Sequence, residues 1–174
     1  MAAHFLDEFA RELGKIGARA FRRRHAMPVL IVSGRTAPVG KRKPVAKPAG
    51  LTDTARERPD AMRAFMSRVY PLIKLTGGVG PVVVGRVLGT GVDVAIADRS
   101  ISKRHCMFVP LDGQVNVSDC ASTNGTAVNG APVRGTAAVQ LCGGEIITIG
   151  RLELTYETPA GFSELVSGLE GAGK

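Results

Sequence analysis

Four short stretches near the middle of the chain hold side chains that suit the binding of a phosphate group. They supply a guanidinium group, an ammonium group, hydroxyl groups and side-chain amides. A phosphorylated side chain carries about two negative charges and accepts hydrogen bonds through its oxygens, so these groups are its natural partners. In chain order the stretches are Gly85-Arg86, Ser102-Lys103-Arg104-His105, Ser122-Thr123-Asn124-Gly125-Thr126 and Val128-Asn129-Gly130.

The stretches fall at the ends of segments that have the sequence pattern of short strands. Residues 82–85 are continuously apolar, and Val92, Val94 and Ile96 alternate with small or polar residues. Residues 105–111 and 114–119 flank Asp112-Gly113, a strong hairpin turn signal. Further strands are predicted at 69–75, 137–141, 145–149 and 152–156. Short strands without intervening helices predict an all-β fold, an antiparallel β-sandwich with the four stretches at strand-to-loop junctions.

The ordered set of stretches resembles a forkhead-associated (FHA) domain, over roughly residues 69–158. The resemblance implies an FHA-like β-sandwich that binds phosphothreonine and is not an enzyme. It also implies a threonine-phosphorylated protein as the partner and a Ser/Thr protein kinase in the same cell. No cofactor or metal is expected.

The resemblance also assigns roles to single residues. Arg86 matches the family arginine that contacts the phosphate, Ser102 matches a serine that does likewise, and Lys103 adds charge where the family often has arginine. Thr123 and Asn124 match the Ser/Thr-Asn-Gly segment, in which the asparagine holds the ligand backbone. Asn129 is a candidate for peptide-backbone contact or loop support.

Three further residues of the motif are expected to support the site without touching the ligand. His105 matches the family histidine that buttresses the phosphate loops by hydrogen bonding. Gly85 allows close backbone packing, and Gly125 suits a tight turn.

The regions outside the predicted sandwich are more helical or more irregular. Phe5, Phe9, Leu13, Ile16 and Ala20 recur every three or four residues and predict an amphipathic helix. A short strand is predicted at 29–32, and the spacing of apolar residues after 159 predicts a C-terminal helix that caps the sandwich. The predicted organisation is an N-terminal helix and strand (1–33), a mobile, basic, Pro- and Gly-rich linker (34–60), the sandwich (61–158) and a C-terminal helix or tail (159–174).

The charge of the chain is concentrated in its N-terminal region. Residues 1–75 carry 16 Lys and Arg against 6 Asp and Glu, a charge of +10, whereas residues 76–174 carry 7 against 9, a charge of −2. Three cysteines without CxxC spacing argue against a disulfide framework or a zinc site, and the chain has no transmembrane segment by sequence. A cytoplasmic protein is therefore expected.

Two other functions remain open from the sequence. The first is a phosphate-independent scaffold that associates with itself or a partner through the sandwich and the N-terminal helix. The second is binding of nucleic acid or an anionic membrane by the basic N-terminal region, although no recognised nucleic-acid motif accompanies the charge. A regulatory hypothesis also arises, in which phosphorylated Thr52 or Thr54 of the linker occupies the phosphate loops.

Overall fold

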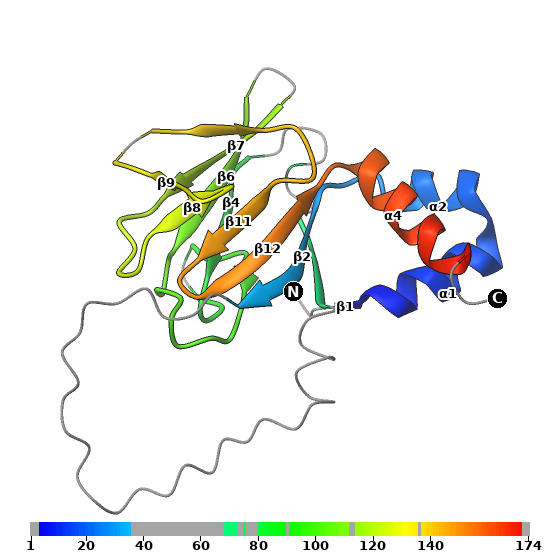
Figure 1. Ribbon diagram of the computed structural model, residues 1–174, viewed down its shortest axis with the longest axis horizontal. Coiled ribbons are helices and arrows are strands. Elements are labelled where there is room, and N and C mark those ends of the chain that lie inside the picture. The colour runs from blue at the N-terminus through cyan, green and yellow to red at the C-terminus, as the bar shows by residue number, and fades with distance from the viewer. Residues whose placement is uncertain are drawn as a thin grey trace, which may run out of the picture.

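The structure, a computed structural model, describes residues 4–35, 68–72, 75, 80–89, 91–111, 114–135 and 137–171. Within these residues two sheets face each other and form a β-sandwich, while three helices pack beside it (Figure 1). The predicted fold class, an antiparallel β-sandwich with terminal helices, is confirmed.

The first sheet has seven strands in the order β1-β3-β2-β12-β11-β8-β9. Their bounds are β1 His4–Phe5, β2 Val29–Arg35, β3 Arg68–Pro71, β8 Thr126–Val128, β9 Ala131–Val133, β11 Ile146–Ile149 and β12 Leu152–Glu157. All neighbours are antiparallel, and the pairing of β12 with β2 shifts register between Glu153 and Leu154.

The second sheet has five strands in the order β10-β7-β6-β4-β5. Their bounds are β4 Val82–Gly85, β5 Val94–Ala95, β6 Cys106–Leu111, β7 Gln114–Asp119 and β10 Val139–Leu141. Only β4 and β5 run parallel. The β6–β7 hairpin pairs Leu111 with Gln114 as the turn signal predicted, although Asp112 and Gly113 themselves lie outside the described residues.

The core of the sandwich is formed by apolar side chains that point inward from both sheets. Leu154 of β12 and Phe108 of β6 are fully buried, and the Phe108 ring stacks on Tyr156 at a centroid distance of 6.4 Å. Alternate residues of β12 are buried, as expected for a strand with one face on the core. This packing gives the connecting loops a fixed base.

The first four residues of strand β2, 29–32, are buried on both faces, which explains why this part of its sequence is continuously apolar. Leu30 and Val32 belong to the sandwich core, whereas Val29 and Ile31 contact the helices. Because β2 is hydrogen-bonded between β3 and β12, it is an interior strand of the first sheet. The sandwich therefore includes residues 29–35, whereas the sequence predicted that it begins at 61 and that a linker begins at 34.

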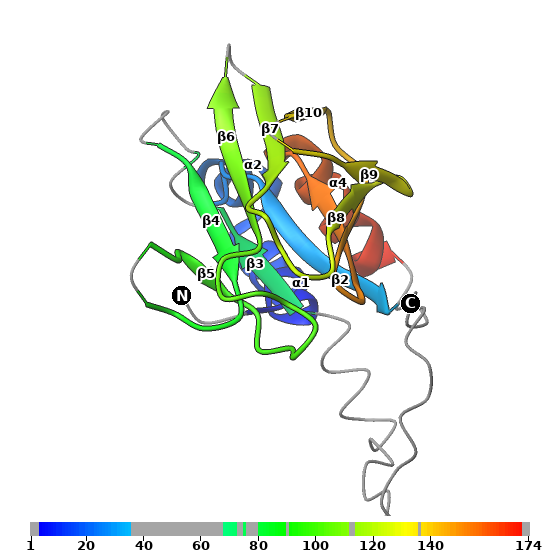
Figure 2. The ribbon, with the colours of Figure 1, turned by 90° about the vertical axis from the view of Figure 1, so that its left-hand side faces the viewer.

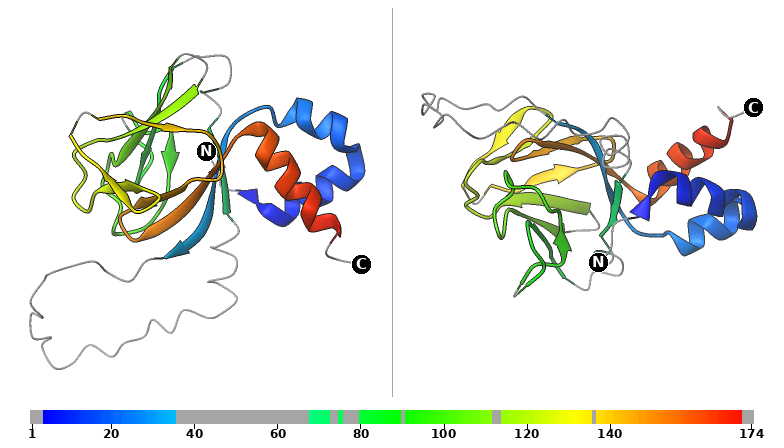
Figure 3. Two further views of the ribbon diagram at one scale, coloured as in Figure 1. Left: turned by 45° about the horizontal axis from the view of Figure 1, so that its top comes forward. Right: turned by 90° about the horizontal axis from the view of Figure 1, so that it is seen from below.

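The helices form a second apolar cluster on the sheet. Helices α1 (Leu6–Ile16) and α2 (Ala18–Arg24) are separated by Gly17, whose φ of 75° interrupts the single helix predicted from the sequence. The C-terminal helix α4 (Pro159–Gly171) lies beside these two helices, and the Phe9 and Phe162 rings are 5.0 Å apart (Figure 3). The predicted C-terminal helix is thus present, and it shares an apolar cluster with the N-terminal helices and the sheet.

Other differences from the sequence concern short segments. The hairpin of β8 and β9 was not predicted, and the strands predicted at 69–75 and 137–141 are shorter, at Arg68–Pro71 and Val139–Leu141. Residues 36–60, which include Thr52 and Thr54, lie outside the described residues.

Candidate functional site

The loops that follow β4, β5 and β7 lie together at the lower end of the sandwich in Figure 2. Between them is an open depression of about 350 Å³. Its lining residues are Arg86, Arg99, Ser100, Ile101, Ser102, Lys103, Thr123 and Asn124. Five of the six residues predicted to contact a ligand are thus brought together from three separate loops, and Asn129 is not among the lining residues.

Two hydroxyl groups join the loops at this depression. The Ser102 hydroxyl donates to Thr123 Oγ1 at 3.2 Å and accepts from the Thr123 backbone N–H at 2.9 Å. Both side chains remain at least partly accessible. A bound anion can therefore receive hydrogen bonds from hydroxyl groups that are already held close together.

His105 connects the same two loops from underneath and is completely buried. Its Nδ1 accepts the Ser102 backbone N–H at 3.0 Å, so the proton lies on Nε2, which donates to the Gly125 carbonyl at 3.0 Å. Burial lowers the pKa of His105, although the Gly125 carbonyl and the charge of Asp119 oppose this shift. A neutral imidazole therefore fixes both loops.

Gly85 allows the loop that follows β5 to lie directly against the end of β4. A Cβ at this position would overlap the Lys103 carbonyl oxygen and come 2.9 Å from the carbonyl carbon. The next residue continues this contact, since the Arg86 backbone N–H donates to the Ser102 carbonyl at 3.0 Å. Glycine is thus required for the approach of the two loops.

Asp98 is the centre of a buried network that the sequence did not reveal. It accepts the Ser100 backbone N–H and hydroxyl, each at 2.8 Å, and it binds the Arg151 guanidinium group through Nε and Nη2 at 3.0 to 3.2 Å. Arg35, at the end of β2, lies 3.5 Å away. Burial favours the neutral acid, but the Arg151 and Ser100 hydrogen bonds outweigh it and lower the pKa of Asp98.

This network reaches the depression through Ser100. The Ser100 hydroxyl accepts the Arg151 backbone N–H at 3.1 Å, and the Ser100 carbonyl accepts Asn124 Nδ2 at 2.7 Å. The turn between β11 and β12, in the first sheet, therefore holds the loop before β6, in the second sheet. Asn124 is oriented by that loop.

A second carboxylate organises the loop between β7 and β8. Asp119 accepts the Ser122 backbone N–H at 2.8 Å, the Ser122 hydroxyl at 2.7 Å and the Thr126 hydroxyl at 2.6 Å. Burial opposes ionisation, but these hydrogen bonds outweigh it and lower the pKa of Asp119. The Ser122 hydroxyl in turn accepts the Gly125 N–H at 3.0 Å, which closes the loop that carries Thr123 and Asn124.

The depression itself is cationic. Arg86 is partly exposed, Arg99 and Lys103 are exposed, and no lining residue is acidic. Sequence reasoning missed Arg99 and Ser100, which lie just before the Ser102 stretch. The one sequence feature that could have indicated an ordered turn at these residues is Asp98, since an Asp followed two residues later by Ser is a common turn pattern.

Asn129 has a local structural role in the turn between β8 and β9. It adopts a positive φ of 49°, which asparagine tolerates better than most residues. Its Oδ1 accepts the Ile146 N–H at 2.9 Å, and its own N–H donates to the Ile146 carbonyl at 2.8 Å. These bonds support the loop.

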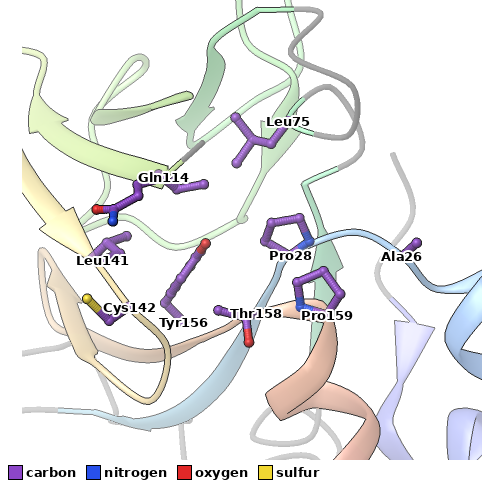
Figure 4. A pocket seen from close by; sticks show the side chains of 10 residues that line it. Ala26, Pro28, Leu75, Gln114, Leu141, Cys142, Tyr156, Thr158 and Pro159 are labelled. Atoms are coloured by element: carbon purple, nitrogen blue, oxygen red, sulfur yellow. The ribbon is translucent and has the colours of Figure 1, made fainter. Parts of the chain in front are cut away.

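A second cavity, of about 480 Å³, lies at the opposite end of β7 between β2, β10, β12 and the start of α4. Figure 4 shows Gln114, Leu141 and Cys142 on one side of it, with Pro28 and Pro159 on the other. Burial raises the pKa of Tyr156, which lines it, to about 12. Among the described residues, no group of His, Cys, Asp or Glu is arranged to hold a metal ion, and no helix is long and apolar enough to cross a membrane.

The connecting loops of the β-sandwich gather cationic and hydroxyl side chains, which suit the binding of an anion. Residues 82–150 match the family model of the FHA domain. FHA domains are phosphopeptide-binding modules.

Two sequence relatives are both from Mycobacterium tuberculosis (strain ATCC 25618 / H37Rv). The chain is 30% identical over 120 residues to the ABC transporter ATP-binding/permease protein Rv1747, an alignment that covers 69% of this chain and 14% of the transporter. It is 38% identical over 76 residues to the FHA domain-containing protein FhaA, covering 43% of this chain and 13% of FhaA. The chain thus spans only a small part of either relative.

Solved structures of FHA domains are also similar to the chain. One, from a structural and functional analysis of phosphothreonine-dependent FHA domain interactions, is 23% identical with a TM-score of 0.47, covering 76% of this chain and 96% of the other. Another is the FhaA FHA domain complexed with the intracellular domain of Rv3910, which is 30% identical with a TM-score of 0.44, covering 52% of this chain and 89% of the other.

Proposed function

We propose that the chain is a non-catalytic adaptor that binds a phosphothreonine-containing segment of another protein in the depression between the loops. The observation that carries this proposal is the meeting of Arg86, Arg99 and Lys103 with the Ser102 and Thr123 hydroxyl groups in one open site. Because no lining residue is acidic, the site favours an anion. A Ser/Thr protein kinase would supply the modified partner.

Each lining side chain has a distinct role in this proposal. The Arg86 guanidinium group pairs with phosphate oxygens in a charge-assisted contact, and Lys103 adds a second positive charge. The Ser102 hydroxyl donates to the phosphate in place of its bond to Thr123. Asn124 uses Nδ2 to hold the Ser100 carbonyl, and in this proposal its Oδ1 accepts an N–H of the bound peptide.

The geometry favours tight recognition because the loops are ordered before the ligand arrives. The buried His105 and Asp98 and the partly buried Asp119 hold the loops that follow β5 and β7 through hydrogen bonds to backbone and side chains. A preformed site loses less conformational entropy on binding than a flexible one. The relative FhaA gives further support, since its FHA domain has been crystallised with the intracellular domain of another protein.

The test is binding of the full chain to an oriented phosphothreonine peptide library. We expect micromolar binding to selected peptides and no binding to their unphosphorylated or phosphoserine forms. Arg86→Ala should abolish binding. Arg134→Ala is the control, because Arg134 is an exposed arginine that does not line the depression. Equal affinity of Arg86→Ala and the unaltered protein would refute the proposal.

The scaffold alternative receives less support from the fold. The apolar stripe of α1, including Phe9 and Leu13, is buried against α4 and the sheet, so it is occupied within the protein. A deletion of residues 1–30 would also remove part of β2 and disturb the sheet. On the basic face, Arg11 and Arg24 pair with Asp7 and Glu12, which reduces the charge offered to nucleic acid or membrane.

A further inference from the structure

We propose that the second cavity, at the opposite end of β7 from the depression, binds a small, uncharged molecule that combines an apolar ring with a carbonyl-type hydrogen-bond acceptor. The cavity measures about 480 Å³, a volume typical of protein sites for small ligands. Pro28, just before β2, and Pro159, at the start of α4, place it where the sandwich meets the helices. It shares no lining residue with the depression, so a ligand here binds independently of phosphothreonine.

A buried tyrosine supplies the hydrogen-bonding group of this cavity. The Tyr156 side chain is only 2% exposed. Figure 4 shows its hydroxyl pointing into the cavity, toward the space between Gln114 and Pro28. The Tyr156 backbone pairs with Glu145 and Gly144, whereas the hydroxyl forms no hydrogen bond within the described part of the chain. A buried hydroxyl without a partner is costly, so an acceptor on a ligand at this point is favoured.

The electrostatics of the cavity select an uncharged ligand. None of the described residues that line it carries a charge, so an ion would lose its hydration there without finding a counterion. Burial and the nearby carboxylates of Glu145 and Glu157 raise the pKa of Tyr156 to about 12. At neutral pH the hydroxyl therefore keeps its proton and donates it to an acceptor. The same carboxylates disfavour a negatively charged ligand.

The walls of the cavity supply the apolar surface for a ring. Pro28 and Pro159 lie on one side and Leu141 on the other (Figure 4), and Leu75 also lines it. None of the large apolar residues exposed in the described part of the chain lines it, so its apolar surface does not continue as a patch around the mouth. Because a protein partner needs a much wider contact surface, a small molecule fits this cavity better than a protein segment.

The rim of the cavity is ordered by hydrogen bonds that need no ligand. The Glu145 carboxylate accepts the Cys142 N–H at 2.7 Å and the Gly143 N–H at 2.9 Å, which holds the turn after β10. On the other side, the Thr158 hydroxyl accepts the Gly161 N–H at 3.2 Å at the start of α4. A preformed cavity loses little conformational entropy when a ligand binds.

The test is a titration of the full chain with acetanilide, an uncharged ring with a carbonyl acceptor, followed through amide chemical shifts. Phenylacetate is the matched probe, since it is of the same size but carries a negative charge. Tyr156→Phe removes only the hydroxyl. Tyr70→Phe is its control, because Tyr70 is the other tyrosine of the chain and is also buried but does not line the cavity. Thermal unfolding curves check that both variants are folded.

We expect acetanilide to bind with a dissociation constant of about 1 mM, which is ordinary for so small a ligand. The largest shifts should fall on the amides of Gln114, Cys142 and Thr158. Phenylacetate should bind about tenfold more weakly, because its charge must be buried without a counterion. Tyr156→Phe should weaken acetanilide binding about fivefold through the loss of one hydrogen bond, and Tyr70→Phe should leave it unchanged.

Four outcomes would overturn the proposal. Three are equal binding of the two probes, equal binding of acetanilide by Tyr156→Phe and the unaltered chain, and an absence of shifts at the cavity well above the expected dissociation constant. The fourth is a dimer in sedimentation with cavity shifts that follow protein concentration and not acetanilide, which would assign the cavity to a second copy of the chain. Phosphothreonine binding at the depression stands in every case, because it uses other residues.

Discussion

Replacing Asp98 with asparagine should loosen the phosphate-site loops, because it removes the charge at the centre of their network. The Asp98 side chain is only 2% exposed and is bound by Arg151 and Ser100. Asparagine has nearly the same shape and can still accept the Ser100 N–H. It cannot pair with the Arg151 guanidinium group as an anion.

The size of the effect follows from the exposure of the two partners. A hydrogen bond to a charged group contributes about 1.5 to 3 kcal/mol to the free energy of unfolding. Since the Arg151 side chain is 46% exposed, water can solvate it after the change, and we expect a loss of about 2 kcal/mol. For a chain of this size that corresponds to a fall in melting temperature of about 4 to 8 °C.

Affinity should fall as well, since Asp98 positions Ser100, whose carbonyl holds Asn124. Loss of one oriented hydrogen bond predicts about a fivefold weaker phosphopeptide complex. Urea unfolding and peptide titration of Asp98→Asn, Arg151→Met and the double variant would measure both effects. Asp7→Asn is the control. It breaks an exposed ion pair with Arg11 and should lower the free energy of unfolding by about 0.5 kcal/mol at most.

The double variant tests the network itself. If Asp98 and Arg151 act together, its loss of stability should be smaller than the sum of the two single losses. Additive losses would show that the residues act separately. Unchanged stability and affinity in Asp98→Asn would show that the Asp98 charge does not hold these loops.

Three other predictions concern different parts of the protein. Gly85→Ala should lower the free energy of unfolding by about 1 to 3 kcal/mol and greatly weaken peptide binding, because the new Cβ would overlap the Lys103 carbonyl. Gly89→Ala, where a Cβ would meet nothing within 4 Å, should leave both unchanged, and equal effects in the two variants would contradict this account. The pKa of His105 is lower in the folded protein than in the unfolded chain. Near pH 6.5 the unfolded chain therefore takes up a proton that the folded protein does not bind. The free energy of unfolding should fall as the pH decreases through about 6.5. Urea unfolding across this range should show a shallower decrease in His105→Asn, and an identical slope would exclude His105 as the cause. Phe9→Ala should lower the free energy of unfolding by about 3 to 5 kcal/mol, because Phe9 belongs to the apolar cluster of the helices. The affinity for phosphopeptide should stay unchanged while the protein is folded. A large loss of affinity would show that the helices and the site are coupled.

Much of the fold was predictable because its strands have clear local patterns. Strand β4 has the predicted bounds, and β6 begins one residue later than predicted. The Asp112-Gly113 signal indicated the hairpin of β6 and β7 because such turns match the twist of paired strands. In contrast, β8 and β9 have only three residues each, too few to establish an alternating pattern.

The position of β2 depended on contacts between distant parts of the chain. Its apolar residues predicted a strand, but its neighbours β3 and β12 follow far later in the sequence. No local pattern specifies such pairing. For the same reason, the predicted sandwich omitted an interior strand.

The site shows the same division between local and distant information. The stretches that hold Arg86, Ser102 and Thr123 were recognisable from their order, and the fold brings them to one depression. The pairing of Asp98 with Arg151 was not recognisable, since 53 residues separate them. Residues that support a site through distant contacts leave little trace in the sequence around it.

The most direct test of phosphothreonine binding is amide chemical-shift mapping of the full chain during titration with a phosphothreonine peptide selected from the library. We expect the largest changes on Arg86, Ser102, Thr123 and their loop neighbours, and none with the unphosphorylated peptide. Changes confined to the helices, or equal changes with both peptides, would contradict phosphothreonine recognition at this site.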